Sequence, residues 1–332
     1  MLSPFTGKEM IVQKEWRSIT YKKEEFKVCF HTWRCEDTGE QFEDDLFAQL
    51  NYDQVQSQYR AKYAIPFREE IVAIREKYDL SAIKMSQVLG FGDNTYRQYE
   101  AGEIPSQSNA RLIQVSADPY EFCKLIALSH ALEGSVLDKV MHKIEHAIQE
   151  QKTKKQNTCI EEYLFGASQP NTFTGYKKPD FDKFAEMVLF FSDKVQPWKT
   201  KLNKLLFYSD FTNFKLTGSS ISGAWYKAIA MGPVPNNFQG IYEFLSNQEV
   251  VDINTTSFPD GGLGEQFRAG LGRKFNSTLF TESELTVLNQ VAERFKDTST
   301  QDIIDISHQE EAWIENQSNN KPIDYIYAFD LK

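Results

Sequence analysis

Apolar positions recur at helical spacing along most of the chain. Residues 44–64, 67–78, 181–195 and 201–217 each place their large apolar side chains three or four positions apart. This spacing puts those side chains on one face of a helix. The pattern therefore predicts a mainly helical protein with small β parts.

The helical pattern is interrupted at both ends of the sequence. Residues 1–42 contain the β-branched and aromatic runs MIVQKEW and FKVCFHTWR, which predict a β-rich module. After residue 220 the pattern predicts a strand near the Gly-Pro turn GPVP, a short helix and the short strand EVVDI. Residues 255–272 are rich in glycine, and we expect a loop there.

Residues 81–105 predict a helix-turn-helix. Ser81 can cap a helix AIKMSQVL, Gly90-Phe91-Gly92 forms the turn, and a short helix NTYRQYEA follows with Asp93 as its cap and Gly102 as its end. We expect the two tyrosines of this helix to point inward. The outward set, with a lysine on the preceding helix, would contact DNA: Asn94, Thr95, Arg97, Gln98 and Lys84. The alternative is a helical bundle with a solvated third helix.

The segment LSAIKMSQVLGFGDNTYRQYEAGEIPS resembles the Xre-like DNA-binding domain of MqsA-type antitoxins. The resemblance implies that Asn94 reads bases. The family's second base-reading residue is an arginine one turn later, and here that place holds Gln98, with Arg97 beside it.

The same family begins with two CxxC knuckles that bind one zinc ion. Ser3, Thr6 and Thr38 stand at three of the four expected cysteine positions, and Cys35 is the fourth. Neutral hydroxyls are poor zinc ligands, so we expect a ribbon that folds without metal. A rearranged site that uses Cys29 and His31 is the alternative.

Composition limits the partners of the protein. The 332-residue chain carries a net charge of −10, which argues against non-specific nucleic-acid binding. We therefore expect local DNA contact by a homodimer. There is no long apolar run and no signal-peptide pattern, which predicts a cytoplasmic protein without membrane contact. The cysteines have no disulfide-framework spacing, and we expect reduced thiols at Cys29, Cys35, Cys123 and Cys159.

The C-terminal part carries a second resemblance. The segment KLNKLLFYSDFTNFKLTGSSISGAWYKAIAMGPVPNNFQGIYEFL resembles the Panacea (SocA-like) domain, whose signature joins K-L-x-K-L-L-Y/F-x-x-D, G-x-x-I-x-G, an aromatic residue and G-P-V-P. The resemblance implies a domain that neutralises a toxin or delivers one to a protease. We expect the protein-binding residues to include Tyr208, Asp210, Trp225, Tyr226, Pro233 and Pro235, with the core as the alternative place for the aromatic ones.

An enzymatic role is not predicted. Asp210, His308, Glu310 and Glu311 are available, but no metal-ligand or nucleophile–base spacing joins them. No P-loop and no cofactor are expected either.

The predicted organisation has four parts. These are a degenerate zinc-ribbon-like module with a helix (1–64), a helix-turn-helix domain (65–117), a helical linker (118–179) and an α+β Panacea domain (180–332). The predicted function is that of an antitoxin that binds a cognate toxin and operator DNA. The alternatives are a transcriptional regulator with a sensing or dimerising C-terminal domain, and a proteolytic adaptor.

Overall fold

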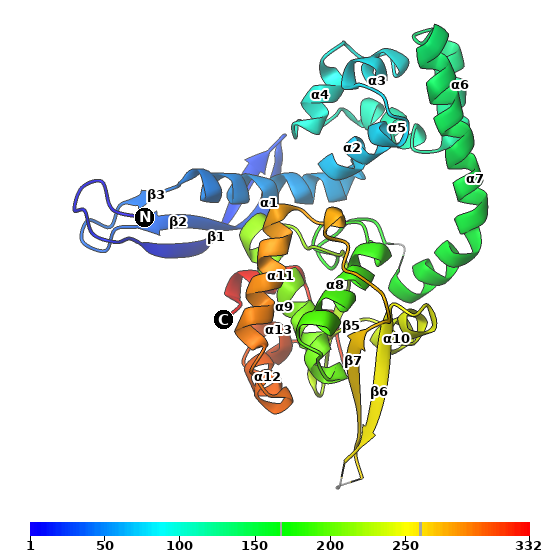
Figure 1. Ribbon diagram of the computed structural model, residues 1–332. Coiled ribbons are helices and arrows are strands. Elements are labelled where there is room, and N and C mark those ends of the chain that lie inside the picture. The colour runs from blue at the N-terminus through cyan, green and yellow to red at the C-terminus, as the bar shows by residue number, and fades with distance from the viewer. Residues whose placement is uncertain (167, 259–260) are drawn as a thin grey trace. The chain divides into compact units, whose positions relative to one another are not determined.

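A computed structural model describes residues 1–166, 168–258 and 261–332, with no account of the side chains of residues 152–159 (Figure 1). The predicted thiol of Cys159 lies outside the described side chains. The chain divides into two compact units, of which one comprises residues 1–55 and 161–332 and the other residues 56–160. The protein is mainly helical with small antiparallel sheets, which confirms the coarse fold prediction.

The N-terminal segment forms a three-stranded antiparallel sheet of β1 (Ile11–Tyr21), β2 (Glu24–Arg34) and β3 (Gln41–Phe42), in that order. Its hairpin turn is Lys22-Lys23, and both residues have positive φ, as a tight two-residue turn requires. Strands β1 and β2 pair over their full length, from Tyr21 opposite Glu24 at the turn to the far end. This sheet confirms the predicted β-rich module.

Helix α1 (Asp45–Tyr63) supplies side chains that complete the hydrogen bonding of β2. The Asn51 amide accepts from the His31 backbone N–H (2.8 Å) and donates to the His31 carbonyl (2.9 Å). Gln54 does the same with Cys29, at 2.9 and 2.8 Å. The backbone groups of Cys29 and His31 therefore point toward α1 and away from β1.

The N-terminal sheet belongs to the same unit as the C-terminal residues. The His31 ring packs against the Phe329 ring with centroids 5.0 Å apart, and Lys14 Nζ donates to the Phe329 carbonyl. The predicted division treats 1–64 as a module of its own, whereas Cys29 and Leu50 lie in the large C-terminal core. Burial of these apolar side chains joins the two segments.

The unit of residues 56–160 consists of short helices around a small core. The helices are α2 (Arg68–Lys77), α3 (Ala82–Val88), α4 (Thr95–Glu100), α5 (Gln107–Val115), α6 (Pro119–Ser129) and the greater part of α7 (Gly134–Phe165). Ser81, Ser106 and Asp118 cap α3, α5 and α6 through their side chains, and the first of these confirms a predicted cap.

One local expectation in this unit is wrong. Asp93 does not cap α4: Asn94 is the N-cap residue, and Asp93 instead accepts a hydrogen bond from Gln87 (3.4 Å). Helix α7 continues without a break to Phe165, because lysine, glutamine and glutamate are good helix formers.

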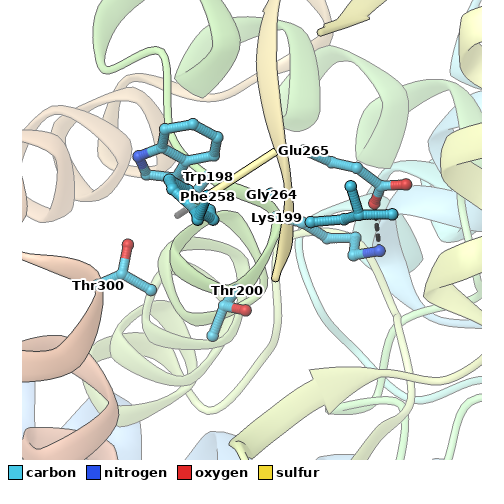
Figure 2. Close-up of a pocket in the computed structure, with 8 residues that line it drawn as sticks. Trp198, Lys199, Thr200, Phe258, Gly264, Glu265 and Thr300 are labelled. Carbon is cyan, nitrogen blue, oxygen red and sulfur yellow. Dashed lines mark ion pairs between the residues drawn. The ribbon is translucent and has the colours of Figure 1, made fainter. Parts of the chain in front are cut away.

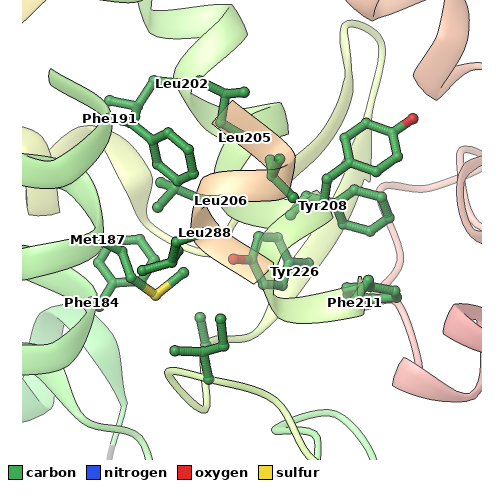
Figure 3. Packing of buried hydrophobic residues seen from close by; sticks show 14 of the residues in the cluster. Phe184, Met187, Phe191, Leu202, Leu205, Leu206, Tyr208, Phe211, Tyr226 and Leu288 are labelled. Carbon is green, nitrogen blue, oxygen red and sulfur yellow. The ribbon is translucent and has the colours of Figure 1, made fainter. Parts of the chain in front are cut away.

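The larger core surrounds helix α9 (Lys199–Thr217). Its buried residues run from Lys201 to Phe214 and lie against α8 (Phe181–Lys194) and α11 (Glu282–Phe295). Figure 3 shows Leu202, Leu205, Leu206 and Tyr208 among phenylalanines from neighbouring elements. The remaining elements are β4 (Tyr226–Ile229), β5 (Gly232–Pro235), α10 (Phe238–Asn247), α12 (Thr300–Ser307), α13 (Glu311–Ile314) and the 3₁₀ turns η1 (Ser277–Leu279) and η2 (Tyr325–Asp330).

The glycine-rich segment predicted as a loop is largely a β-hairpin. Strands β6 (Val251–Ser257) and β7 (Leu263–Ala269) pair in antiparallel register (Figure 1). Gly264 lies within β7, and only glycine fits there: a Cβ would meet the Phe258 ring at 2.6 Å and the Trp198 ring at 2.8 Å. Glycine in this stretch therefore permits close packing and does not break the strand.

Candidate functional site

Helix α4 presents its polar side chains to solvent. Asn94, Arg97 and Gln98 are exposed and Thr95 is half-buried. Tyr96 and Tyr99 are buried, as predicted. The exposed set therefore lies on one face of a short helix that is held from behind.

The buried tyrosines fix this helix to its neighbours. Tyr96 donates its hydroxyl to the Ile71 carbonyl (2.8 Å), and its backbone N–H donates to Ser86 Oγ on α3 (3.0 Å). Tyr99 accepts from the Asn109 amide on α5 (2.8 Å). These contacts orient the polar face of α4 without using any of its exposed side chains.

The electrostatics around α4 are mixed. Residues 66–117 contain six lysines and arginines against seven aspartates and glutamates. Arg75 and Glu100 form an ion pair at 2.5 Å, so the Arg75 charge is already compensated within the unit. Lys84 on α3 is half-buried, with Nζ 3.5 Å from the Ala131 carbonyl. Affinity of this face for DNA would therefore depend on few cations.

In the C-terminal unit, Asp210 is a fully buried carboxylate that holds a loop. Its Oδ1 accepts from the backbone N–H groups of Ile221 and Ser222 (2.8 Å each). Its Oδ2 accepts from Ser222 Oγ (2.6 Å) and from the Tyr226 hydroxyl (2.8 Å). Burial raises the pKa of Asp210, and these hydrogen bonds oppose that rise.

The glycines of the signature permit close approach. Gly218 ends α9 in the left-handed conformation (φ 74°). A Cβ on Gly232 (φ 95°) would lie 2.5 Å from Ser307 Oγ and 2.6 Å from Lys204 Cε. Lys204 is fully buried, its Nζ donates to the Pro233 carbonyl (3.0 Å), and burial lowers its pKa to about 7.

Most of the predicted protein-binding residues lie in the core, which is the alternative place that the sequence left open for the aromatic ones. Tyr208, Asp210 and Tyr226 are buried, as are Pro233 and Pro235 in β5. Tyr208 donates to buried Glu310 (3.1 Å). In this structure these residues therefore form part of the framework of the domain.

Trp225 is the predicted contact that is partly accessible. It is half-buried against the Phe173 ring, with centroids 5.8 Å apart. Its Nε1 is buried and has no hydrogen-bond partner among the described residues.

Two accessible hollows of this unit lie along the β6–β7 hairpin, one of them beside its turn, which the sequence patterns did not indicate. A hollow of about 260 Å³ is lined by Trp198 and Phe258, which Figure 2 shows, and also by Leu263. A second hollow, of about 350 Å³, lies against α10 and includes Tyr242 and Phe267. The Lys199–Glu265 ion pair lines both.

The Cys35 thiol lies among the hydroxyl groups of Ser3, Thr6 and Thr38. Cys35 Sγ lies 3.6 Å from Thr6 Oγ1, and hydrogen bonds from Ser3, Thr38 and Thr6 lower the pKa of Cys35 to about 6. One thiolate with three neutral hydroxyls does not fit a structural zinc ion.

The alternative metal site also lacks the necessary donors. Burial raises the pKa of Cys29 to about 11, and His31 Nδ1 is 2.8 Å from the Cys29 carbonyl oxygen. Among the described residues no cluster of three histidine, cysteine or acidic side chains could hold a metal ion.

Comparison with known families assigns part of the C-terminal unit. Residues 202–314 match the sequence model of the family described as "Antitoxin SocA-like, Panacea domain". The chain contains a SocA-like Panacea domain. The match spans α9 to α13 and includes Asp210 and Gly232. A search of curated proteins found no match, and neither did a search of solved structures.

The Panacea domain suggests an antitoxin role and a toxin partner. It also suggests a non-enzymatic role. Of the acids considered for catalysis, Asp210 and Glu310 are buried and hydrogen-bonded within the fold. Within the part of the chain that the structure describes, every helix is too short or too polar to cross a bilayer.

Proposed function

We propose that this protein is an antitoxin that binds and neutralises a cognate toxin through its Panacea domain. The match of residues 202–314 to an antitoxin family is the observation that carries the proposal. The turn end of the β6–β7 hairpin is the contact surface that we assign to this domain. Leu263 is 72% exposed and Phe258 is 41% exposed beside a hollow that an apolar side chain of the toxin would fill.

We further propose that α4 binds operator DNA. Asn94 and Gln98 can pair with adenine and Arg97 with guanine in the major groove. Their exposure, together with the two tyrosine anchors behind them, supports this assignment. Because residues 66–117 contain only six lysines and arginines, we expect binding to require two copies of the helix on one operator.

A growth assay tests toxin neutralisation. The product of the adjacent gene is expressed alone and then together with this protein, and we expect growth arrest only in the first case. Leu263→Arg should weaken the rescue, whereas Leu128→Arg, at a leucine 77% exposed in the other unit, should not. Equal rescue by both variants would move the contact away from the hairpin. Failure of the unaltered protein to rescue growth would refute the antitoxin role.

The same assay separates the two alternatives. A proteolytic adaptor would require a protease for rescue, and the toxin would disappear from cells that make both proteins. A plain transcriptional regulator would bind the operator without any rescue from toxin supplied by an unrelated promoter.

A further inference from the structure

Strand β1 is an edge strand along its whole length. The order of the sheet is β1-β2-β3, so β1 has a strand on one side only within the described residues (Figure 1). Eleven residues are long for an edge, and an exposed edge of this length is a template for pairing with another strand.

The backbone groups on this edge can be identified. In an antiparallel pair, opposite residues either both point their N–H and C=O groups toward each other or both point them away. Cys29 and His31 direct these groups to α1, and they lie opposite Trp16 and Lys14. The backbone groups of Trp16 and Lys14 therefore point outward.

The same alternation extends this property to every second residue of β1. The outward set is Val12, Lys14, Trp16, Ser18 and Thr20. All five are exposed, and the described residues contain no hydrogen-bond acceptor for their backbone N–H groups. The edge thus offers a continuous row of donors and acceptors.

We propose that this edge pairs with β1 of a second copy of the chain, in antiparallel register centred on Trp16. This register sets each outward backbone group opposite an outward group of the partner. It also overlaps the two strands over their full length, with Ile11 opposite the partner's Tyr21. The result is a six-stranded sheet with two-fold symmetry, in which the same patch serves both subunits.

The charges on β1 favour this register, and they favour β1 of a second copy of the chain as the strand that pairs with it. Centring on Trp16 places Glu15 opposite the partner's Arg17, and Arg17 opposite the partner's Glu15. These positions are non-hydrogen-bonded pairs, in which opposite side chains approach most closely. Centring one residue earlier or later would set Glu15 against Glu15 or Arg17 against Arg17. Beyond the strand, the chosen register brings Glu9 level with the partner's Lys23.

Charged residues on an edge usually prevent pairing. Here the two charges have opposite signs and lie on one face of β1, where they already form an ion pair within the chain. A symmetric partner adds a second pair to each charge, so this edge is complementary to itself. The inference concerns subunit contact and does not depend on the antitoxin role.

Analytical ultracentrifugation of the full chain tests the proposal. We expect a monomer–dimer equilibrium, with dissociation constants at least about tenfold higher for Glu15→Arg and for Arg17→Glu, because each places like charges opposite one another. Ser18→Pro removes an outward N–H and should weaken the dimer to a similar extent, whereas Ser18→Ala should not.

A mixing experiment separates contact between chains from the ion pair within one chain. Each single charge variant has like charges at positions 15 and 17 and should associate poorly with itself. An equimolar mixture of the two variants pairs arginines with glutamates and should form a heterodimer with affinity near that of the unaltered protein. Circular dichroism and thermal melting confirm that each variant is folded.

Three results would overturn the proposal. The first is a protein that stays monomeric at all concentrations. The second is a dimer unaffected by both charge variants and by Ser18→Pro, which would locate the contact elsewhere. The third is a pair of variants that dissociate and do not recover on mixing, which would assign the charges to the stability of a single chain.

Discussion

The two regions that carry sequence motifs place their polar motif residues in opposite environments. On α4, Asn94, Arg97 and Gln98 face solvent. In the Panacea domain, Lys204 and Asp210 are buried and bond to the backbone of their own chain. The first motif therefore describes a surface, and the second describes how a fold is held together.

This difference decides what each motif can reveal. A match to the Panacea signature identifies the domain, because Asp210 holds the loop after α9 and Gly232 permits the close approach of β5 to Lys204 and Ser307. The match does not locate the toxin contact. The α4 motif, in contrast, names candidate contacts, and the tyrosines behind it define the local fold.

The strongest test of this comparison is Asp210→Ala. It would leave the buried N–H groups of Ile221 and Ser222 and the Tyr226 hydroxyl without their acceptor. We expect a loss of about 3–5 kcal/mol in the free energy of unfolding, measured by urea denaturation. Asp252→Ala, at an exposed aspartate on β6, should change it by about 0.5 kcal/mol or less. A stable Asp210→Ala protein that had lost only toxin binding would instead make Asp210 a contact residue.

Gly232→Ala should have the next largest effect. The new methyl group would collide with Ser307 and Lys204 and would occupy a left-handed backbone. We expect a loss of about 2–4 kcal/mol by the same measurement. Gly272 also has positive φ, but a methyl group added there would meet nothing within 4 Å, so Gly272→Ala should cost only about 1 kcal/mol. Equal losses of stability for Gly232→Ala and Gly272→Ala would show that the left-handed backbone, and not steric crowding, requires glycine at position 232.

The α4 motif should respond in the opposite way. Asn94→Ala combined with Gln98→Ala should leave the free energy of unfolding within about 0.5 kcal/mol, because both side chains are exposed. Operator binding in low salt should weaken by about 1–3 kcal/mol for each lost base contact. Gln151→Ala on α7 serves as a control for a general loss of polar surface. Unchanged affinity of the double variant would remove α4 from the DNA interface.

Periodicity and capping residues predicted much of the helical fold. Ser81 marks a helix start that the structure confirms, because a cap depends on neighbours in sequence. The β6–β7 hairpin was missed because its glycines were interpreted as loop residues. Gly264 is needed for contact with Trp198, which lies far away in sequence.

The site residues could likewise be predicted where local spacing decides their orientation, and not where distant contacts decide it. The outward face of α4 follows from spacing on one short helix, so Tyr96 and Tyr99 were placed correctly. The Panacea aromatics could not be assigned to core or surface in this way. Tyr208 lies on a helix that is buried on nearly all sides, where the 3.6-residue period carries no information.

The last prediction is a gradual pH dependence that originates from Lys204. Burial lowers its pKa from 10.5 to about 7 in the folded protein. Between these values the unfolded chain binds a proton that the folded chain does not, so the free energy of unfolding should rise with pH above 7. The contribution has an upper limit of about 1.4 kcal/mol per pH unit.

Lys204→Met should flatten this slope in urea titrations between pH 7 and 9. The comparison needs a control, because the lowered pKa of Cys35 adds a contribution of the same sign above pH 6. Cys35→Ser removes that contribution and should leave the Lys204 slope in place. If Lys204→Met has the slope of the unaltered protein while Cys35→Ser is flat, the buried lysine keeps its proton. The Lys204 side chain would then be a buried ammonium group that the Pro233 carbonyl stabilises. The core of this domain would then contain a positive charge at physiological pH.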